Sequence, residues 1–325
     1  MQNPFLARAA AVLLAAELPA LAAAQAYPMK PLKIIVPYSP GGTTDLLARL
    51  VGQKLTERMG QPVIVDNKPG ANGMIGTDAV AKAAADGYTL GIASPGSHGA
   101  NASLYKGTIT YDTLKDFTPI TQAVTAPFLL VVHPSLGVST VKELIAAAKA
   151  KPGEISYASG GSGSSQHMAM ELFKTMAGVD MTHVPYKGSA ASYPDLLGGT
   201  VKTEIDVLPT ALPHVKSGKL KVLATGSPKR LALLPEVPTI AESGVPGYES
   251  TSWYGFVAPA NLPKDVLAKL HAEISRALQQ PDVVEKLTSA GVIVVASKPE
   301  EFSAFIKSEV DKAAKVVKAA NIKPD

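Results

Sequence analysis

Residues 32–60 read LKIIVPYSPGGTTDLLARLVGQKLTERMG, and the change of pattern inside this stretch decides the fold class. The β-branched run at 32–38 predicts a buried strand, and apolar residues at helical spacing predict an amphipathic helix over 44–60 that ends at a glycine. A short glycine-containing turn joins them. A strand that leads directly into a helix is the repeating unit of α/β proteins.

The same alternation continues along the chain. Further strands are expected at 61–67, 88–94, 128–134, 155–159, 182–186, 203–209 and 219–225. Further helices are expected at 73–87, after the capping box Thr140-x-x-Glu143, and at 165–178, 191–199, 264–280 and 300–320. This order predicts an α/β fold with largely parallel sheets.

Two segments are candidates for crossings between two lobes. Thr121–Phe128 is a strand-like run broken by Pro127, and Ser250–Pro259 contains the only tryptophan. If both cross, lobe 1 comprises 27–126 plus 253–325, and lobe 2 comprises 127–252. Two crossings make a hinged cleft.

Residues 1–26 have the layout of a cleaved secretory signal peptide. Arg8 precedes an apolar run, and small residues offer A-x-A cleavage sites, of which the one after Ala26 is favoured. A membrane anchor needs about 20 uninterrupted apolar residues, whereas Glu17 and Pro19 interrupt this run. The sequence therefore predicts export to the periplasm and a soluble mature protein.

Composition narrows the function. The chain has no cysteine and a net charge of +4, without a clustered basic stripe. Nucleic-acid binding normally shows such a stripe. The six histidines form neither a His-x-x-x-His pair nor a cluster, so we expect no metal site and no cofactor.

The first candidate binding element lies between the first strand and its helix. Thr43 or Thr44 is expected to cap the helix, and Gly41 and Gly42 leave backbone N–H groups uncovered beside its positive end. This arrangement suits an anion, although many α/β turns contain glycine for geometry alone. The candidate residues are Tyr38, Ser39, Pro40, Gly41, Gly42, Thr43 and Thr44.

The second candidate element occupies the same position in the other predicted lobe. Three glycines and four serines between a strand and a helix supply many neutral hydrogen-bond donors, and a flexible linker is the alternative. Placed across a cleft, the two elements would hold a carboxylate-bearing molecule. The candidates are Ser159, Gly161, Ser162, Gly163, Ser164, Ser165 and His167, with His167 expected to be a neutral donor.

Further candidates follow other strand ends, the edge at which open α/β sheets bind ligands. Tyr186 is expected to donate its hydroxyl to a carboxylate, and Asp206 either to accept from the ligand or to orient a loop. The complete set adds Ser94, Ser97, His98, Tyr186 and Asp206.

Nucleotide and nucleophile motifs do not fit these elements. A P-loop ends in Gly-Lys-Ser/Thr, and neither element has a lysine there. Gly160-Gly161-Ser162-Gly163-Ser164 is not a Gly-x-Ser-x-Gly elbow. We expect no enzyme activity, and an exported serine hydrolase using Ser164 or Ser165 remains the alternative.

Several motifs together resemble one known family. VPYSPGGTTD, DNKPGANGMIG, YASGGSGSSQHMAMELF, VPYKGSAASYPDLLGG and LPEVPTIAESGVPGYES are similar to those of the Bug (TctC-like) extracytoplasmic solute receptors of tripartite tricarboxylate transporters. The resemblance covers the mature chain in order.

This resemblance implies a type II periplasmic-binding-protein fold with two α/β lobes and a ligand cleft between them. It implies two pincer loops on a carboxylate, with the candidates above facing the ligand. It also implies one large and one small integral-membrane partner; a receptor for a membrane sensor is the alternative. We expect the protein to be a monomer. Ile205-Asp206-Val207 departs from the Phe-Asp-Asn of many relatives.

Overall fold

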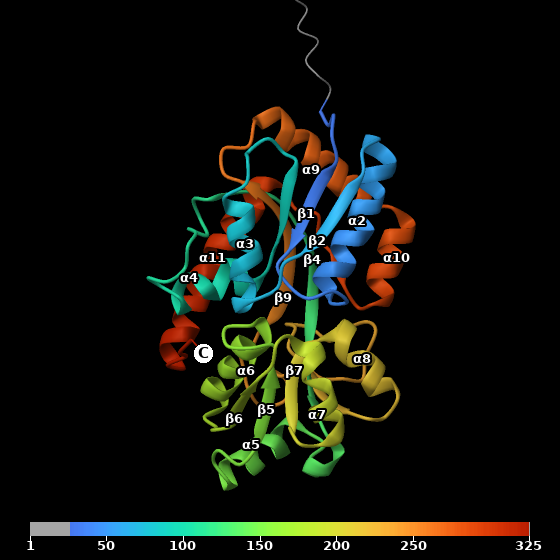
Figure 1. Cartoon of the computed structure of the whole chain (residues 1–325). Coiled ribbons are helices and arrows are strands. Elements are labelled where there is room, and N and C mark those ends of the chain that lie inside the picture. The colour runs from blue at the N-terminus through green and yellow to red at the C-terminus, as the bar shows by residue number, and fades with distance from the viewer. Residues whose placement is uncertain (1–26, 325) are drawn as a thin grey trace, which may run out of the picture.

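The structure, a computed structural model, describes residues 27–324, and the predicted signal peptide lies outside them. Its strands form two sheet regions that share one long strand (Figure 1). Lobe 1 contains β1 (Leu32–Val36), β2 (Val63–Asn67), β3 (Thr89–Ala93), β9 (Thr251–Pro259) and β10 (Ile293–Val294). Lobe 2 contains β5 (Ser156–Ser159), β6 (Thr182–Pro185), β7 (Thr203–Val207) and β8 (Lys221–Thr225).

Helices cover both faces of the lobe 1 sheet. One face carries α2 (Thr43–Met59), α9 (Lys264–Leu278) and α10 (Pro281–Ser289), and the other carries α3 (Met74–Ala81), α4 (Asn101–Leu104) and α11 (Pro299–Ala319) (Figure 1). Leu47, Leu270 and Leu287 pack into the core of the first face. Phe302 and Ile306 of α11 pack around Trp253 on the second.

Lobe 2 is built in the same way around a smaller sheet. Its helices are α5 (Val141–Ala150), α6 (Ser165–Ala177), α7 (Tyr193–Gly198) and α8 (Leu208–Lys216). The predicted cap of α5 is confirmed, because Thr140 Oγ1 accepts from the Glu143 N–H at 3.1 Å.

The long strand β4 (Phe117–Val132) belongs to both lobes. It pairs with β9 as far as Pro127 and with β7 from Phe128 onward. The expected break at Pro127 is wrong: the proline stands where β4 changes partners, a position that tolerates a residue without an N–H. The partner change lies beside the expected lobe boundary, which stays a prediction.

The sheets are less parallel than expected. The β1–β2, β1–β3, β5–β6 and β5–β7 pairs are parallel, but β4 and β9 run antiparallel to their neighbours. The helix expected at 73–87 ends at Ala81. A separate turn follows before β3, in which the Tyr88 N–H donates to Asp86 Oδ1 at 3.1 Å and Gly87 adopts φ +83°. Between residues 27 and 324, no helix is both long and apolar enough to span a membrane.

Candidate ligand-binding site

Residues 38–45, here called loop 1, join β1 to α2. Ser39, Pro40, Gly41 and Gly42 are exposed, and the helix begins at Thr43. The expected threonine cap is wrong: Gly42 is the N-cap and no side chain caps the helix. The reason lies in the first turn, where the Asp45 carboxylate accepts from the Gly41 N–H at 3.1 Å and folds the loop back onto the helix.

Asp45 anchors loop 1 to the rest of lobe 1. Its carboxylate also accepts from Arg49 Nε at 2.9 Å and from Asn67 Nδ2 at 3.1 Å. Burial opposes ionisation, but these hydrogen bonds prevail and hold the pKa of the Asp45 carboxyl below its usual range. Thr43 Oγ1 is buried and makes no hydrogen bond within the described residues. Asp45 therefore anchors loop 1 to lobe 1, and the Thr43 hydroxyl at the start of α2 is available to a ligand.

Residues 159–167, here called loop 2, join β5 to α6. Ser164 caps α6 and accepts from the His167 N–H at 3.3 Å. Ser159 is buried and accepts from the Gly161 N–H at 3.1 Å, and its hydroxyl also bonds His183 Nε2 at 2.6 Å. Gly161 and Gly163 adopt φ +113° and +75°, so glycine is required for this shape. The side chains of Ser159 and Ser164 thus stabilise the conformation of loop 2 and do not form its exposed surface.

His167 also supports loop 2 from inside. Its Nδ1 accepts from the Gly163 N–H at 3.0 Å, which fixes this nitrogen as unprotonated. The ring stacks on His183 with centroids 3.9 Å apart. The ring is therefore neutral, as expected for a histidine in the first turn of a helix, but Nδ1 accepts a bond from the backbone of loop 2 instead of donating one.

Loop 2 contacts lobe 1 in this structure. A Cβ placed on Gly163 would lie 2.5 Å from Leu104 Cδ2 and 3.0 Å from Asn72 Nδ2. Leu104 ends α4, and Asn72 lies in the turn before α3. The two lobes therefore meet at a point where only a glycine fits.

The candidates at the carboxyl end of β3 form one chain of hydrogen bonds. The Tyr38 hydroxyl bonds Ser94 Oγ at 2.7 Å, Ser94 Oγ bonds Ser97 Oγ at 3.0 Å, and Ser97 Oγ bonds His98 Nδ1 at 2.9 Å. Burial raises the pKa of the Tyr38 hydroxyl. This chain connects loop 1 to the 94–98 turn.

His98 faces the interior of lobe 1. Its ring packs edge-on against Phe117 at 4.6 Å, and burial lowers its pKa to about 3. Ile35, Val80 and Val257 lie around it. This placement favours a supporting role for His98 over ligand contact.

Tyr186 and Asp206 are both committed to partners within lobe 2. The Tyr186 hydroxyl donates to Asp195 Oδ2 at 2.6 Å, and burial raises the pKa of Tyr186 to about 12. Asp206 Oδ1 accepts from Gln166 Nε2 at 3.0 Å and Oδ2 from the Tyr193 hydroxyl at 3.0 Å. Of the two roles expected for Asp206, the loop-orienting one is visible, since Gln166 belongs to loop 2.

Asp206 shares one face of β7 with a second buried carboxyl group. Neither Glu204 nor Asp206 is exposed to solvent. Burial, followed by the charge of Asp206, raises the pKa of Glu204 well above its usual value. Burial raises the pKa of Asp206 from 3.8 to about 6. Ionising both carboxyl groups in a buried site costs much free energy, because the two negative charges repel each other and neither is solvated.

This pair gives a stability prediction. Asp206 has a higher pKa folded than unfolded, so it contributes stability below about pH 4 that is lost as the pH rises through 6. Relative to Asp206→Asn, the free energy of unfolding of the parent protein should therefore fall between pH 4 and 6, by up to about 1.4 kcal/mol per pH unit. Urea unfolding at pH 4, 5, 6 and 7 measures this difference.

The titration of His98 changes the free energy of unfolding with pH in the opposite direction. The effect of Asp206 is therefore measured by comparing variants and not from the parent protein alone. The pKa of His98 is lowered, so its contribution is present above pH 6.5 and is lost as the pH falls toward 3. The exposed Asp180→Asn is the matched control in lobe 2 and should keep the parent slope. Identical slopes for Asp206→Asn and the parent would contradict the burial argument.

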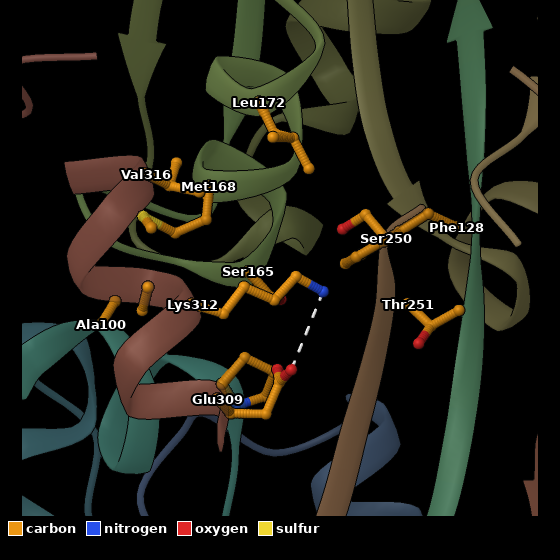
Figure 2. Close-up of a pocket in the computed structure, with 12 residues that line it drawn as sticks. Ala100, Phe128, Ser165, Met168, Leu172, Ser250, Thr251, Glu309, Lys312 and Val316 are labelled. Atoms are coloured by element: carbon orange, nitrogen blue, oxygen red, sulfur yellow. Dashed lines mark ion pairs between the residues drawn. The ribbon is translucent and has the colours of Figure 1, made fainter. Parts of the chain in front are cut away.

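A groove between the lobes lies beside α11 (Figure 2). Lys312 and Glu309 of α11 form a 3.7 Å ion pair at its wall, opposite Ser250 and Thr251 at the start of β9. Among the predicted site residues only Ser165 lines it. Met168 and Leu172 of α6 make the apolar side.

Sequence reasoning missed three residues that hold the loops in place. Gln166, in the first turn of α6, and Tyr193, within VPYKGSAASYPDLLGG, were not among the predicted site residues. Asn72 was quoted only as part of PGANG. Their positions next to strand ends and glycines were the available signal. No group of three or more metal-ligating side chains occurs among residues 27–324.

Comparison with known proteins places this geometry in a family. The model described as tripartite tricarboxylate transporter family receptor matches residues 47–322. Protein BugT of Bordetella pertussis is 39% identical over 300 residues, which cover 92% of each chain.

Solved structures agree in fold. An R. palustris protein solved with adipate has a TM-score of 0.87 at 40% identity, covering 92% of this chain and 100% of that one. MatC from Rhodopseudomonas palustris, solved with bound malate, has a TM-score of 0.84 at 32% identity, covering 90% and 100%. The architecture is thus the periplasmic-binding-protein fold expected from the resemblance, and the chain belongs to the Bug/TctC family of solute-binding receptors.

Proposed function

We propose that this protein captures a small carboxylate-bearing solute between its two lobes without a chemical step. One observation carries the proposal: two glycine-rich loops, each opening a helix, lie on different lobes, and loop 2 contacts lobe 1 at Gly163. Helix N-termini and backbone N–H groups favour anions. The relatives solved with adipate and with malate support a carboxylate as the ligand class.

The proposed contacts are the exposed part of loop 1 and the N–H groups and hydroxyls of loop 2. Thr43 Oγ1 is a further donor, because it is buried without a bond. Hydrogen bonds to a charged group contribute about 1.5–3 kcal/mol each, and micromolar affinity needs about 8 kcal/mol. A few such bonds are therefore enough for micromolar affinity, even after the free-energy cost of closing the lobes on the ligand.

A binding screen tests this function. A ligand that binds only the folded state raises the melting temperature, by an amount that grows with its concentration. The chain from residue 27 should be stabilised by adipate or malate and not by the matched diamides, with one site in calorimetry. No shift with mono-, di- or tricarboxylates would overturn the assignment.

We further propose that the protein acts in the periplasm as a monomer and delivers its ligand to one large and one small membrane subunit. Deletion of the gene should then abolish uptake of the ligand found in the screen. Ligand-dependent signalling with unchanged uptake would instead favour a membrane sensor as the partner.

The serine hydrolase is the competing function for loop 2. The Ser164 hydroxyl accepts the His167 N–H, and the Ser165 hydroxyl bonds Gln166 Oε1 at 3.2 Å. We expect no ester cleavage by the parent protein. Ester turnover that disappears in Ser164→Ala or Ser165→Ala would establish the enzyme instead.

A further inference from the structure

The turn at residues 70–73 holds four consecutive residues with positive φ. Gly70 and Gly73 adopt +129° and +83°, and between them Ala71 and Asn72 adopt +47° and +48°. Residues other than glycine are uncommon in this region, and such backbone persists only where its surroundings hold it. This turn precedes α3 and faces loop 2.

Asn101 is the residue that holds the turn. Asn72 Nδ2 donates to Asn101 Oδ1 at 2.8 Å, and Asn101 Nδ2 donates to the Asn72 carbonyl at 3.0 Å. Asn101 is completely buried, and the neighbouring Tyr111 hydroxyl donates to the Ser97 carbonyl at 2.8 Å. The two reciprocal bonds fix both the backbone and the carboxamide of Asn72.

The fixed carboxamide lies where three loops of the site meet. A Cβ on Gly96, in the 94–98 turn, would lie 3.0 Å from Asn72 Oδ1. A Cβ on Gly163, in loop 2, would lie 3.0 Å from Asn72 Nδ2. Both neighbours are glycines, so the amide lies close to two backbones, one from each lobe.

We propose that Asn72 is a positioning residue for ligand capture: its locked carboxamide is the part of lobe 1 on which loop 2 closes. The inference rests on the proposed function. The carboxamide sets how near loop 2 comes to loop 1, and therefore how long a bound solute is retained. Because it acts through backbone contacts, it affects every ligand of the cleft in the same direction.

The test is Asn72→Gly, which keeps the left-handed backbone and removes the carboxamide. We expect Kd to rise about tenfold through faster dissociation, with the association rate changed less than threefold. Asn261→Gly is the matched control, because Asn261 also has a positive φ, +65°, in an exposed turn beyond β9. Stopped-flow and calorimetry with the best carboxylate of the screen supply the readouts.

A double variant separates positioning from a merely structural role. Gly163→Ala should weaken binding about tenfold in the parent and by a clearly smaller factor in Asn72→Gly, because the contact with Asn72 is then gone and only the one with Leu104 remains. Unchanged dissociation in Asn72→Gly, or factors that simply multiply, would overturn the inference. Both of these contrary results are compatible with carboxylate binding by the parent protein. If the parent itself bound no carboxylate, the proposed function would be wrong.

Discussion

Gly163→Val is expected to weaken carboxylate binding about 30-fold to 100-fold, corresponding to about 2–3 kcal/mol. The new Cβ would lie 2.5 Å from Leu104 Cδ2 and 3.0 Å from Asn72 Nδ2, so loop 2 could not keep its contact with lobe 1. A β-branched residue at φ +75° is also strained. Isothermal titration calorimetry measures the change in Kd.

Gly218→Val separates the two effects of this substitution. Gly218 has a nearly equal φ of +71°, but a Cβ there would meet no atom within 4 Å. It should therefore lose stability from backbone strain and keep the parent affinity. Equal losses of affinity in both variants would show that strain, not contact between the lobes, weakens binding.

Trp253→Ala is expected to lower the free energy of unfolding by about 3–5 kcal/mol, the range for deleting a large buried aromatic side chain. Trp253 is only 1% exposed, and its ring packs edge-on against the rings of Phe302 and Phe305, with ring centroids 5.8 Å and 5.3 Å apart. Its Nε1–H donates to Glu309 Oε2 at 2.8 Å. This one side chain of β9 thus packs α11 onto the strands that join the lobes.

Urea unfolding followed by far-ultraviolet circular dichroism measures this loss, because the variant has no tryptophan left to report it. Trp253→Phe retains most of the packing and loses only the bond to Glu309, so it should cost less than half as much. A loss below about 1 kcal/mol in Trp253→Ala would mean that α11 is held elsewhere.

The sequence predicted the strand–helix units well because each carries its own signal. The 44–60 pattern ends at Gly60, which caps α2 with φ +70°. The predicted Thr140 cap of α5 follows from a similarly local pattern. These features depend on residues three or four positions apart, which the chain displays directly.

Predictions that depended on distant partners failed or stayed open. The antiparallel β4 looked like a short strand, since nothing local shows that β9, more than a hundred residues later, pairs along it. Pro127 read as a break because its missing N–H matters only if a partner is present on that side.

The site residues show the same division. Loop 1 and loop 2 were found as glycine-rich turns, but the bond of Asp206 to Gln166 joins segments that the sequence does not relate. Asn72 was missed because its importance comes from Asn101 and Gly163, which the fold brings beside it. A pattern identifies what a loop offers, and the fold decides where each group is used.

The central claim is that the two loops jointly hold one carboxylate-bearing ligand. The most direct measurement is a crystal structure of the chain from residue 27 grown with the tightest-binding carboxylate. We expect one ligand between the lobes, with carboxylate oxygens bonded, directly or through one water, to N–H groups or hydroxyls of both loop 1 and loop 2. A ligand bonded to only one of the two loops, including one held in the groove beside α11, would contradict it.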